Sequence, residues 1–319
     1  MKSVQDIHNI LVVGTGMMGP GIALSAARGG FNVRLYGRSE ASLQRGSERL
    51  TENCARLIQY ELADREEIDA ARRRIHLTDG LESAAQDADM IIESIVEHQA
   101  TKQALYDRLC RVCAADVILT TNSSGLSITR LAAAVHHPDR FVGTHFWNPP
   151  YLMPLVEVVK GECTSDNTLE VVCQVIERSG KRPVRVLKDI PGYLGNHLQH
   201  ALWREALARV EKGVATPEDI DTMVKYSFAL RMPPLGIFEF MDLVGIDLVQ
   251  SCHEYLFADL DNRTTPSPVT TRLCAQGHLG AKTGQGFYTW TREKIAERQR
   301  RRDEEIVRQL RLARGEGAL

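Results

Sequence analysis

Hydrophobic and polar positions divide the chain into two regions with different periodicities. Up to about residue 187, short apolar runs rich in β-branched residues alternate with helical patterns. The runs predict strands over 10–13, 32–36, 75–78, 89–92, 117–121, 141–145, 155–160 and 183–187. The patterns between them predict helices over 40–74, 81–88, 99–113, 128–135 and 169–179, the first being a long charged region. Such alternation is typical of an α/β fold with a doubly wound, mostly parallel sheet.

From residue 193 the pattern becomes almost wholly helical. It predicts helices over 193–213, 217–227, 243–256 and 266–276, with a proline-rich turn at 233–234. The stretch 291–313 is dense in Arg and Glu, which is typical of a solvated helix or a frayed tail. We therefore expect two domains, an α/β domain over 1–188 and an all-α domain over 189–319.

Composition narrows the class of protein. Of 319 residues, 43% are hydrophobic and 25% charged, and 39 Lys and Arg balance 41 Asp and Glu, which gives no argument for nucleic acid as a partner. The N-terminus is polar and no apolar run approaches about 18 residues, so we expect no signal peptide and no membrane span. Seven scattered cysteines form no disulfide framework, which favours a reducing, cytoplasmic location. Cys110 and Cys113 form a single CxxC, which we interpret as helix-face thiols rather than a zinc or redox site.

A glycine-rich turn joins the first predicted strand to the helical pattern that follows it. Gly14, Gly16 and Gly19 have the spacing G-x-G-x-x-G. Between a strand and a helix, this spacing lets a pyrophosphate approach bare backbone at a helix N-terminus. The alternative is a strand-to-helix turn that binds nothing. The predicted cofactor contacts of this turn are Gly14, Gly16, Met17, Met18 and Gly19.

The end of the second strand lacks the carboxylate that usually contacts the adenosine ribose of NAD. Gly37 stands at that position, followed by Arg38 and Ser39. A small residue followed by Arg and Ser makes room for a 2′-phosphate and offers donors to it, which favours NADP or a relaxed choice. Alternatively, Arg38 is an exposed turn residue and Glu40 approaches the ribose.

Polar residues also follow two further strands. Glu93 and Glu97 come at the end of the strand over 89–92, Lys102 lies on the next helix, and an NSSG turn over 122–125 follows the strand over 117–121. Ligands bind at the carboxyl ends of strands in doubly wound sheets, so we expect functional contacts here. Surface charges and a helix cap are the alternatives.

His145 is the candidate general acid/base, because it ends a strand beside the dinucleotide site. An imidazole suits an alcohol–carbonyl pair, since its ordinary pKa of about 6.5 is near working pH. Glu157 on the next strand is its candidate carboxylate partner, which would fix the tautomer. The alternative is a structural histidine. One candidate histidine and scattered carboxylates form no metal-ligand cluster.

Seven segments resemble the successive motifs of the L-3-hydroxyacyl-CoA dehydrogenase family. They are GTGMMGPGIA, IIESIVEHQATK, TNSSGLSIT, THFWNPPYLMPLVEVVKG, DIPGYLGNHL, GIFEFMDLVGID and KTGQGFY, in order from about residue 9 to 290. The tail beyond Trp290 resembles a branch that includes lambda-crystallin-type gulonate dehydrogenases and a pyridoxine-degradation dehydrogenase.

The resemblance implies a Rossmann-type domain, a helical domain through which a homodimer forms, and a role for individual residues. It places the base at His145, its partner at Glu157, and the contacts to the substrate oxygen at Ser124 and Asn196. The cofactor contacts that the resemblance implies beyond the glycine turn are Glu97, Lys102, Asn148 and Lys282. Asn122 is a further predicted contact from its place just beyond a strand end.

The expected function is hydride transfer between NAD or NADP and a 3-hydroxyacyl-CoA, such as 3-hydroxybutyryl-CoA, or its 3-keto form. The second helical region offers Arg45, Arg49 and Arg56 but no lysine to contact a CoA phosphate. A substrate without CoA, either a free hydroxy acid or an aromatic alcohol, is therefore the alternative. Two further functional classes stay open, a cofactor-binding protein without catalysis and an imine- or hydroxyisobutyrate-type reductase.

Overall fold

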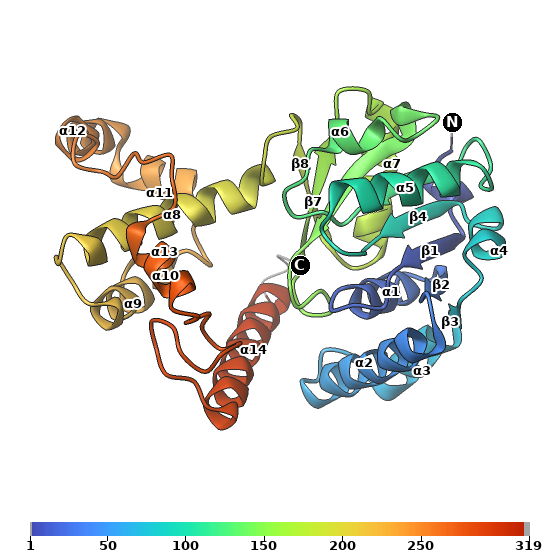
Figure 1. Ribbon diagram of the computed structural model, residues 1–319, viewed down its shortest axis with the longest axis horizontal. Helices are drawn as coiled ribbons and strands as arrows, with labels where there is room; N and C mark the ends of the chain where they lie inside the picture. The colour runs from blue at the N-terminus through green and yellow to red at the C-terminus, as the bar shows by residue number, and fades with distance from the viewer. Residues whose placement is uncertain (1, 316–319) are drawn as a thin grey trace. The chain divides into compact units, whose positions relative to one another are not determined.

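A computed structural model describes residues 2–315, with only the main chain at residue 314. The chain forms two compact units, residues 1–196 and residues 197–319 (Figure 1). The predicted boundary between residues 188 and 189 stays a prediction.

The first unit is built on one mixed sheet of eight strands in the order β3-β2-β1-β4-β5-β6-β7-β8. Every neighbouring pair is parallel except β6 and β7, which are antiparallel. The predicted doubly wound, mostly parallel sheet is therefore confirmed. The strands are β1 (Asn9–Val13), β2 (Asn32–Tyr36), β3 (Ile75–Thr78), β4 (Met90–Glu93), β5 (Ile118–Thr121), β6 (Phe141–Phe146), β7 (Leu155–Lys160) and β8 (Arg182–Val186).

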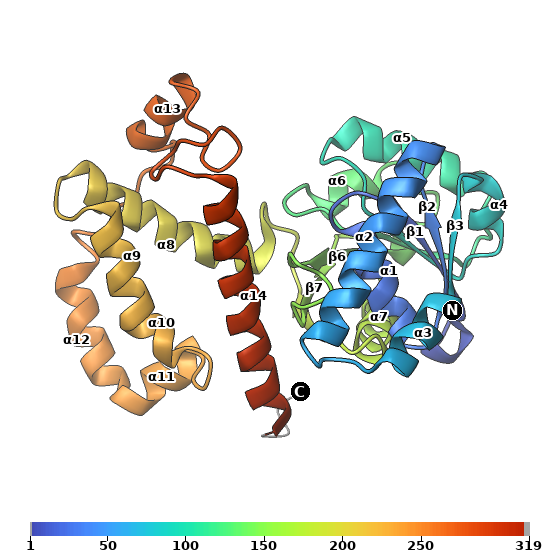
Figure 2. The same ribbon diagram turned by 90° about the horizontal axis from the view of Figure 1, so that it is seen from below.

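Helices cover both faces of this sheet (Figure 2). Alternate strand residues such as Leu11 and Ile91 pack with Leu81, Tyr106 and Leu131 of α4, α5 and α6 into one buried core. On the other face α1 contacts β1 and β2, while α7 contacts β6, β7 and β8. The helices of this unit are η1 (Val4–Asp6), α1 (Gly19–Arg28), α2 (Glu40–Gln59), α3 (Arg65–Arg73), α4 (Leu81–Gln86), α5 (Gln99–Cys110), α6 (Ile128–Ala132), η2 (Pro138–Arg140) and α7 (Asp166–Arg178).

The predicted helical region over 40–74 is interrupted between α2 and α3. Glu61 has a φ of 54°, which no helical residue adopts, and the Asp64 side chain accepts a hydrogen bond from Glu67 N to begin α3. Both sides of the break carry the same charged helical pattern, so periodicity alone did not reveal it.

The second unit contains most of α8 (Tyr193–Glu211) and the helices that follow it. The prediction of one helix over 243–256 is wrong at its start, because Gly245, with a φ of 97°, separates α11 from α12. No described helix is long and apolar enough to cross a membrane. The helices are α8 (Tyr193–Glu211), α9 (Pro217–Tyr226), α10 (Phe228–Arg231), α11 (Ile237–Val244), α12 (Ile246–Leu256), α13 (Pro268–Ala275) and α14 (Arg292–Gly315).

The glycine turn between β1 and α1 is folded tightly on itself. Gly14 has a φ of 121°, and a Cβ built on Gly19 would lie 1.8 Å from the carbonyl oxygen of Gly14. A Cβ built on Gly16 would meet no atom within 4 Å. Gly19 is therefore required by the fold itself, whereas Gly16 is not.

We expect G19A to lower the free energy of unfolding by about 3 kcal/mol, because the added methyl group has no space against main chain. The matched variant G16A should leave the thermal midpoint unchanged, because its methyl group meets nothing. Thermal unfolding followed by circular dichroism measures both. Equal midpoints for the two variants would contradict this account of the turn.

Candidate active site

Three chain segments meet at the carboxyl edge of the sheet. In the parallel register Val13 lies beside Glu93, and Glu93 lies beside Thr121. The glycine turn after β1, the segment after β4 and the serine turn after β5 therefore leave the sheet side by side. This is the edge at which ligands bind in open α/β sheets.

His145 and Glu157 form a buried pair on β6 and β7. They are opposite each other in the antiparallel register, and His145 Nδ1 lies 2.7 Å from Glu157 Oε2. Only 9% of the histidine side chain and 2% of the carboxylate side chain are exposed. An ionised carboxylate only accepts hydrogen bonds, so Nδ1 carries the proton and Nε2 is the basic nitrogen of the neutral imidazole.

The second oxygen of Glu157 is held by the N-terminus of α8. Oε1 accepts hydrogen bonds from Leu194 N at 3.0 Å and Gly195 N at 2.8 Å. These main-chain donors have no partner inside the helix, and the helix dipole favours a negative charge at this end. Burial alone would raise the pKa of Glu157, but the hydrogen bonds from His145 and Gly195 outweigh it and lower that pKa below 4.5.

Aromatic side chains surround the pair. The ring centroids of Trp147 and Tyr193 lie 5.5 and 5.7 Å from that of His145. A Cβ built on Gly195 would lie 2.3 Å from Cζ2 of Trp147, so glycine allows both the indole and the main-chain donor to reach the pair. Trp147 Nε1 is buried without a hydrogen-bond partner among the described residues.

Glu97 organises the serine turn. Its Oε1 accepts a short hydrogen bond from Ser123 Oγ and a second one, of 2.9 Å, from Ser124 N. Lys102 Nζ lies 3.3 Å from its Oε2. Burial acts to raise the pKa of Glu97, but the Ser123 hydrogen bond and the Lys102 charge lower it overall.

The two predicted asparagines at this edge make protein contacts. Asn196 Nδ2 donates to the carbonyl oxygen of Ser124 at 2.7 Å, which ties the start of α8 to the serine turn. Asn122 Oδ1 accepts from Phe146 N at 2.9 Å, next to His145. The structure thus brings Ser124, Asn196 and Asn122 together with the strand that carries the histidine.

Lys102 lies in the interior rather than on the surface. Its side chain is 1% exposed and its Nζ lies 2.6 Å from Oε1 of Glu93, which is itself 0% exposed. The possibility that Glu93 is a surface charge is therefore wrong. The signal for its burial was its place at the end of an apolar strand.

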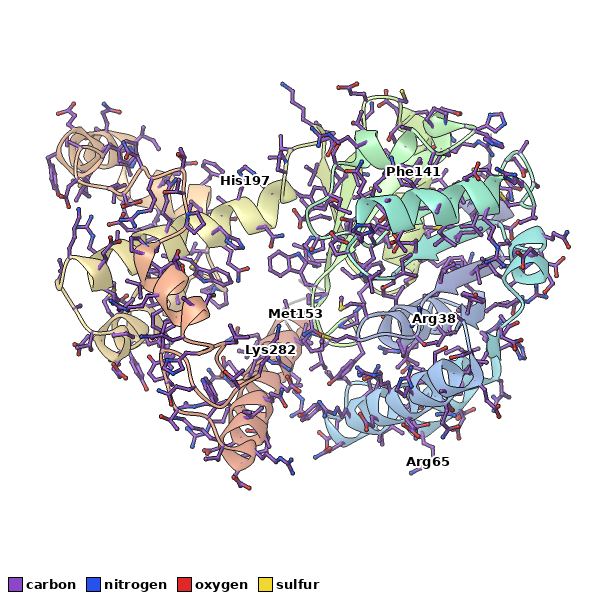
Figure 3. All side chains as sticks on the ribbon, viewed as in Figure 1. Arg38, Arg65, Phe141, Met153, His197 and Lys282 are labelled. Carbon is purple, nitrogen blue, oxygen red and sulfur yellow. The ribbon has the colours of Figure 1, made fainter. Side chains whose placement is uncertain are left out.

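Gly37 does not leave the open space that the sequence suggested. A Cβ built on it would lie 2.7 Å from Ser42 Oγ and 2.8 Å from Leu43 Cδ2, so close packing against α2 fills that side. Arg38 is exposed (Figure 3). Ser39 is also exposed, and its side chain caps α2 by accepting from Ser42 N. Donors for an anion come from Arg38 and this helix N-terminus.

The remaining predicted cofactor contacts are Met17, Met18, Asn148 and Lys282. Met17 is 63% exposed, Met18 is the N-cap residue of α1 with no side-chain cap, and Asn148 is exposed after β6. Lys282 lies in the second unit and is exposed (Figure 3). No group of three His, Cys, Asp or Glu within the described part of the chain could hold a metal ion.

Cys110, the last residue of α5, and Cys113, in the turn that follows, are half-buried free thiols. Burial raises the pKa of both above 9.0, so they remain protonated at neutral pH. Protonated thiols are poor nucleophiles and poor metal ligands. The interpretation as helix-face thiols holds for Cys110 but is wrong for Cys113, because α5 ends at Cys110.

Comparison with known proteins gives matches along the chain. The model of the 3-hydroxyacyl-CoA dehydrogenase NAD-binding domain matches residues 9–190, and that of the C-terminal domain matches residues 192–290. A probable 3-hydroxybutyryl-CoA dehydrogenase of Bacillus subtilis is 37% identical and aligns with 89% of this chain and 98% of its own length.

A second relative aligns with nearly the whole chain. The 5-formyl-3-hydroxy-2-methylpyridine 4-carboxylate 5-dehydrogenase of Mesorhizobium japonicum is 33% identical over 97% of this chain and 99% of its own length. A crystal structure of such a 5-dehydrogenase, described as an NAD+-dependent dismutase, has a TM-score of 0.91 at 33% identity, covering 97% of this chain and 99% of its own. These matches confirm the resemblance and its branch.

The pH dependence of stability provides a test of the Glu157 contacts. Because the folded pKa of Glu157 is lowered, its contribution to stability is present above 4.5, its ordinary value, and is lost as pH falls through the folded pKa. We expect the difference in thermal midpoint between wild type and E157Q to be largest near pH 7 and to shrink below about pH 4.5.

E52Q, at an exposed glutamate of α2, serves as the control and should follow wild type throughout. Thermal unfolding between pH 3 and pH 7 measures all three proteins. A difference in thermal midpoint between wild type and E157Q that does not depend on pH would contradict the assigned contacts of Glu157.

Proposed function

Since the chain belongs to the 3-hydroxyacyl-CoA dehydrogenase family, we propose that it transfers hydride between NAD and a 3-hydroxyacyl-CoA, such as 3-hydroxybutyryl-CoA, or its 3-keto form. It is an NAD-dependent dehydrogenase that acts on a hydroxyl group. The observation that carries the proposal is the buried His145–Glu157 pair, whose carboxylate is held at its far oxygen by α8.

The residues at the carboxyl edge fit a dinucleotide. The space beside Gly16 is open, and the first turn of α1 has no side-chain cap, so its main-chain donors suit a pyrophosphate. When bound, the nicotinamide ring accepts or supplies the hydride. Glu97, Lys102, Asn122, Asn148 and Lys282 are proposed further contacts to the cofactor.

The chain's own residues handle the proton and the oxygen. Nε2 of His145 takes the hydroxyl proton during oxidation and returns it during reduction, while Glu157 stabilises the imidazolium. The Ser124 hydroxyl and the Asn196 amide are the proposed donors to the substrate oxygen, where charge changes most during the reaction.

A second candidate substrate is a free hydroxy acid or an aromatic alcohol without CoA. The Mesorhizobium relative aligns with 97% of the chain, so its match includes most of residues 291–319, which lie beyond the family models. The Bacillus relative leaves 11% of the chain unmatched. This shared tail is the observation that favours the second candidate.

We also propose self-association as a homodimer through the helical unit. Large apolar side chains of α9, α11 and α12 are exposed, among them Tyr226 at 78%, Phe238 at 80% and Ile246 at 58%. An apolar surface of this kind is typical of an interface between subunits.

Wild type should oxidise 3-hydroxybutyryl-CoA with NAD, and H145Q should lower kcat about 10³-fold because the general base is lost. The NADH dissociation constant should not change in H145Q. Stopped-flow absorbance of NADH measures the rates, with free 3-hydroxybutyrate and an aromatic alcohol assayed beside the CoA ester. Turnover of the free substrates alone would favour the second candidate, a substrate without CoA. An undiminished rate in H145Q would contradict the proposed mechanism.

We propose that the cofactor choice extends to NADP, because Arg38 and the α2 N-terminus replace the usual acidic residue. R38A should then lower kcat/KM for NADPH about tenfold, through loss of a charge-assisted contact, and leave NADH within about twofold.

R65A, at an exposed arginine that begins α3, is the matched control and should change neither value. Initial-rate kinetics with both cofactors measures the four ratios. A wild type that strongly prefers NADH and does not respond to R38A would contradict the NADP proposal. G37D is a poorer test, because its side chain would disturb the packing of Ser42 and Leu43.

A further inference from the structure

Four hydrogen-bond donors converge on Glu93, which is wholly buried at the end of β4. Oε1 accepts from Lys102 Nζ at 2.6 Å and Ile95 N at 2.7 Å. Oε2 accepts from Thr121 Oγ1 at 2.6 Å and from Tyr106 OH at 3.1 Å, and the Tyr106 proton is shared with Thr120 O, which is also 3.1 Å away. A carboxylate has about four lone-pair directions, so this one is fully used by the protein and is closed to a ligand.

The donors come from separate segments of the carboxyl edge. Ile95 belongs to the turn after β4, whose Ser94 carbonyl oxygen would lie 2.4 Å from a Cβ on Gly14 of the glycine turn. Lys102 and Tyr106 lie on α5, and Thr121 ends β5 directly before the serine turn. The Glu93 carboxylate therefore connects three segments, which are the Ser94–Ile95 turn beside the glycine turn, α5, and the serine turn.

Lys102 extends this connection to Glu97. Its ammonium lies 2.6 Å from Glu93 and 3.3 Å from Glu97, and Glu97 in turn accepts hydrogen bonds from Ser123 and Ser124. Burial and the charge of Glu93 hold the pKa of Tyr106 well above 10.0, so its hydroxyl remains a neutral donor. Tyr106 therefore joins the cluster as a hydrogen-bond donor without adding a charge.

We propose that Glu93 is a positioning residue for the dinucleotide site, which sets the places of Lys102, the Ser94–Ile95 turn and the serine turn without touching the cofactor. This inference rests on the proposed function. A purely structural role would make the cluster contribute to stability alone. If Glu93 instead positions the site, loss of any of its donors also weakens cofactor binding.

Substitution of Glu93 itself is an ambiguous test, because E93Q places an NH2 group against two donors and removes the counter-charge of buried Lys102. Thr121 offers a milder change. Its hydroxyl donates to Glu93 and accepts from Ser123 N, and T121V keeps its shape.

Thr164 provides a matched control far from the carboxyl edge. It is 4% exposed, and its Oγ1 donates to Phe141 O at 2.5 Å and accepts from Gly161 N at 2.9 Å. Phe141 begins β6, so this threonine lies at the opposite edge of the sheet. T164V removes a hydroxyl that also donates one hydrogen bond and accepts one from main-chain N–H, and that is also buried.

The experiment is a fluorescence titration of each variant with NADH, and with NADPH, in the absence of substrate, beside a thermal unfolding curve. We expect T121V to raise the dissociation constant about fivefold and T164V to leave it unchanged, although both lower the thermal midpoint. Y106F, which removes the other donor to Oε2, should weaken binding in the same direction. At saturating cofactor, T121V should keep kcat within about twofold while KM for the cofactor rises.

Equal dissociation constants for wild type, T121V and Y106F overturn the inference while leaving the proposed function intact. An equal increase of the dissociation constant in T164V and T121V also overturns the inference, because weaker binding would then result from general destabilisation. A wild type that binds neither NADH nor NADPH overturns the proposed function and this inference with it.

Discussion

The carboxylate of Glu157 is the contact on which the arrangement of the site depends. One oxygen fixes the imidazole of His145, and the other receives two main-chain donors from the start of α8. The pair exists because β6 and β7 are the antiparallel neighbours of an otherwise parallel sheet, which places residues twelve apart in sequence directly opposite each other. A parallel connection needs a crossover of a dozen or more residues and could not pair them so closely in sequence.

The same carboxylate also determines where the helical part of the chain begins. The first turn of α8 has unpaired N–H groups that need acceptors, and a buried anion satisfies two of them. In return, these donors keep Glu157 ionised despite its burial. Asn196, one residue further along, then ties the helix to the serine turn through Ser124 O. The His145–Glu157 pair, the serine turn and the start of α8 are therefore one hydrogen-bonded unit.

Much of this could be predicted from the sequence, because the signals are local. Apolar β-branched runs located the strands, and the G-x-G-x-x-G spacing located the turn after β1. The break at Glu61 and the separation of helices at Gly245 depend on single residues with positive φ inside continuous patterns, so periodicity missed them. The role of Glu93 was also hidden, because its donors at residues 102, 106 and 121 meet it only in the folded sheet.

The aromatic surroundings of the pair add a constraint that no single position reveals. The indole of Trp147 occupies the space into which a side chain at residue 195 would project, since a Cβ there would lie 2.3 Å from Cζ2. The same glycine brings its N–H to Glu157. A change at either position alters the space beside His145 and the donors to Glu157 together, so effects of the two are not additive. Trp147 and Gly195 therefore act as one unit that shapes the space beside the His145–Glu157 pair.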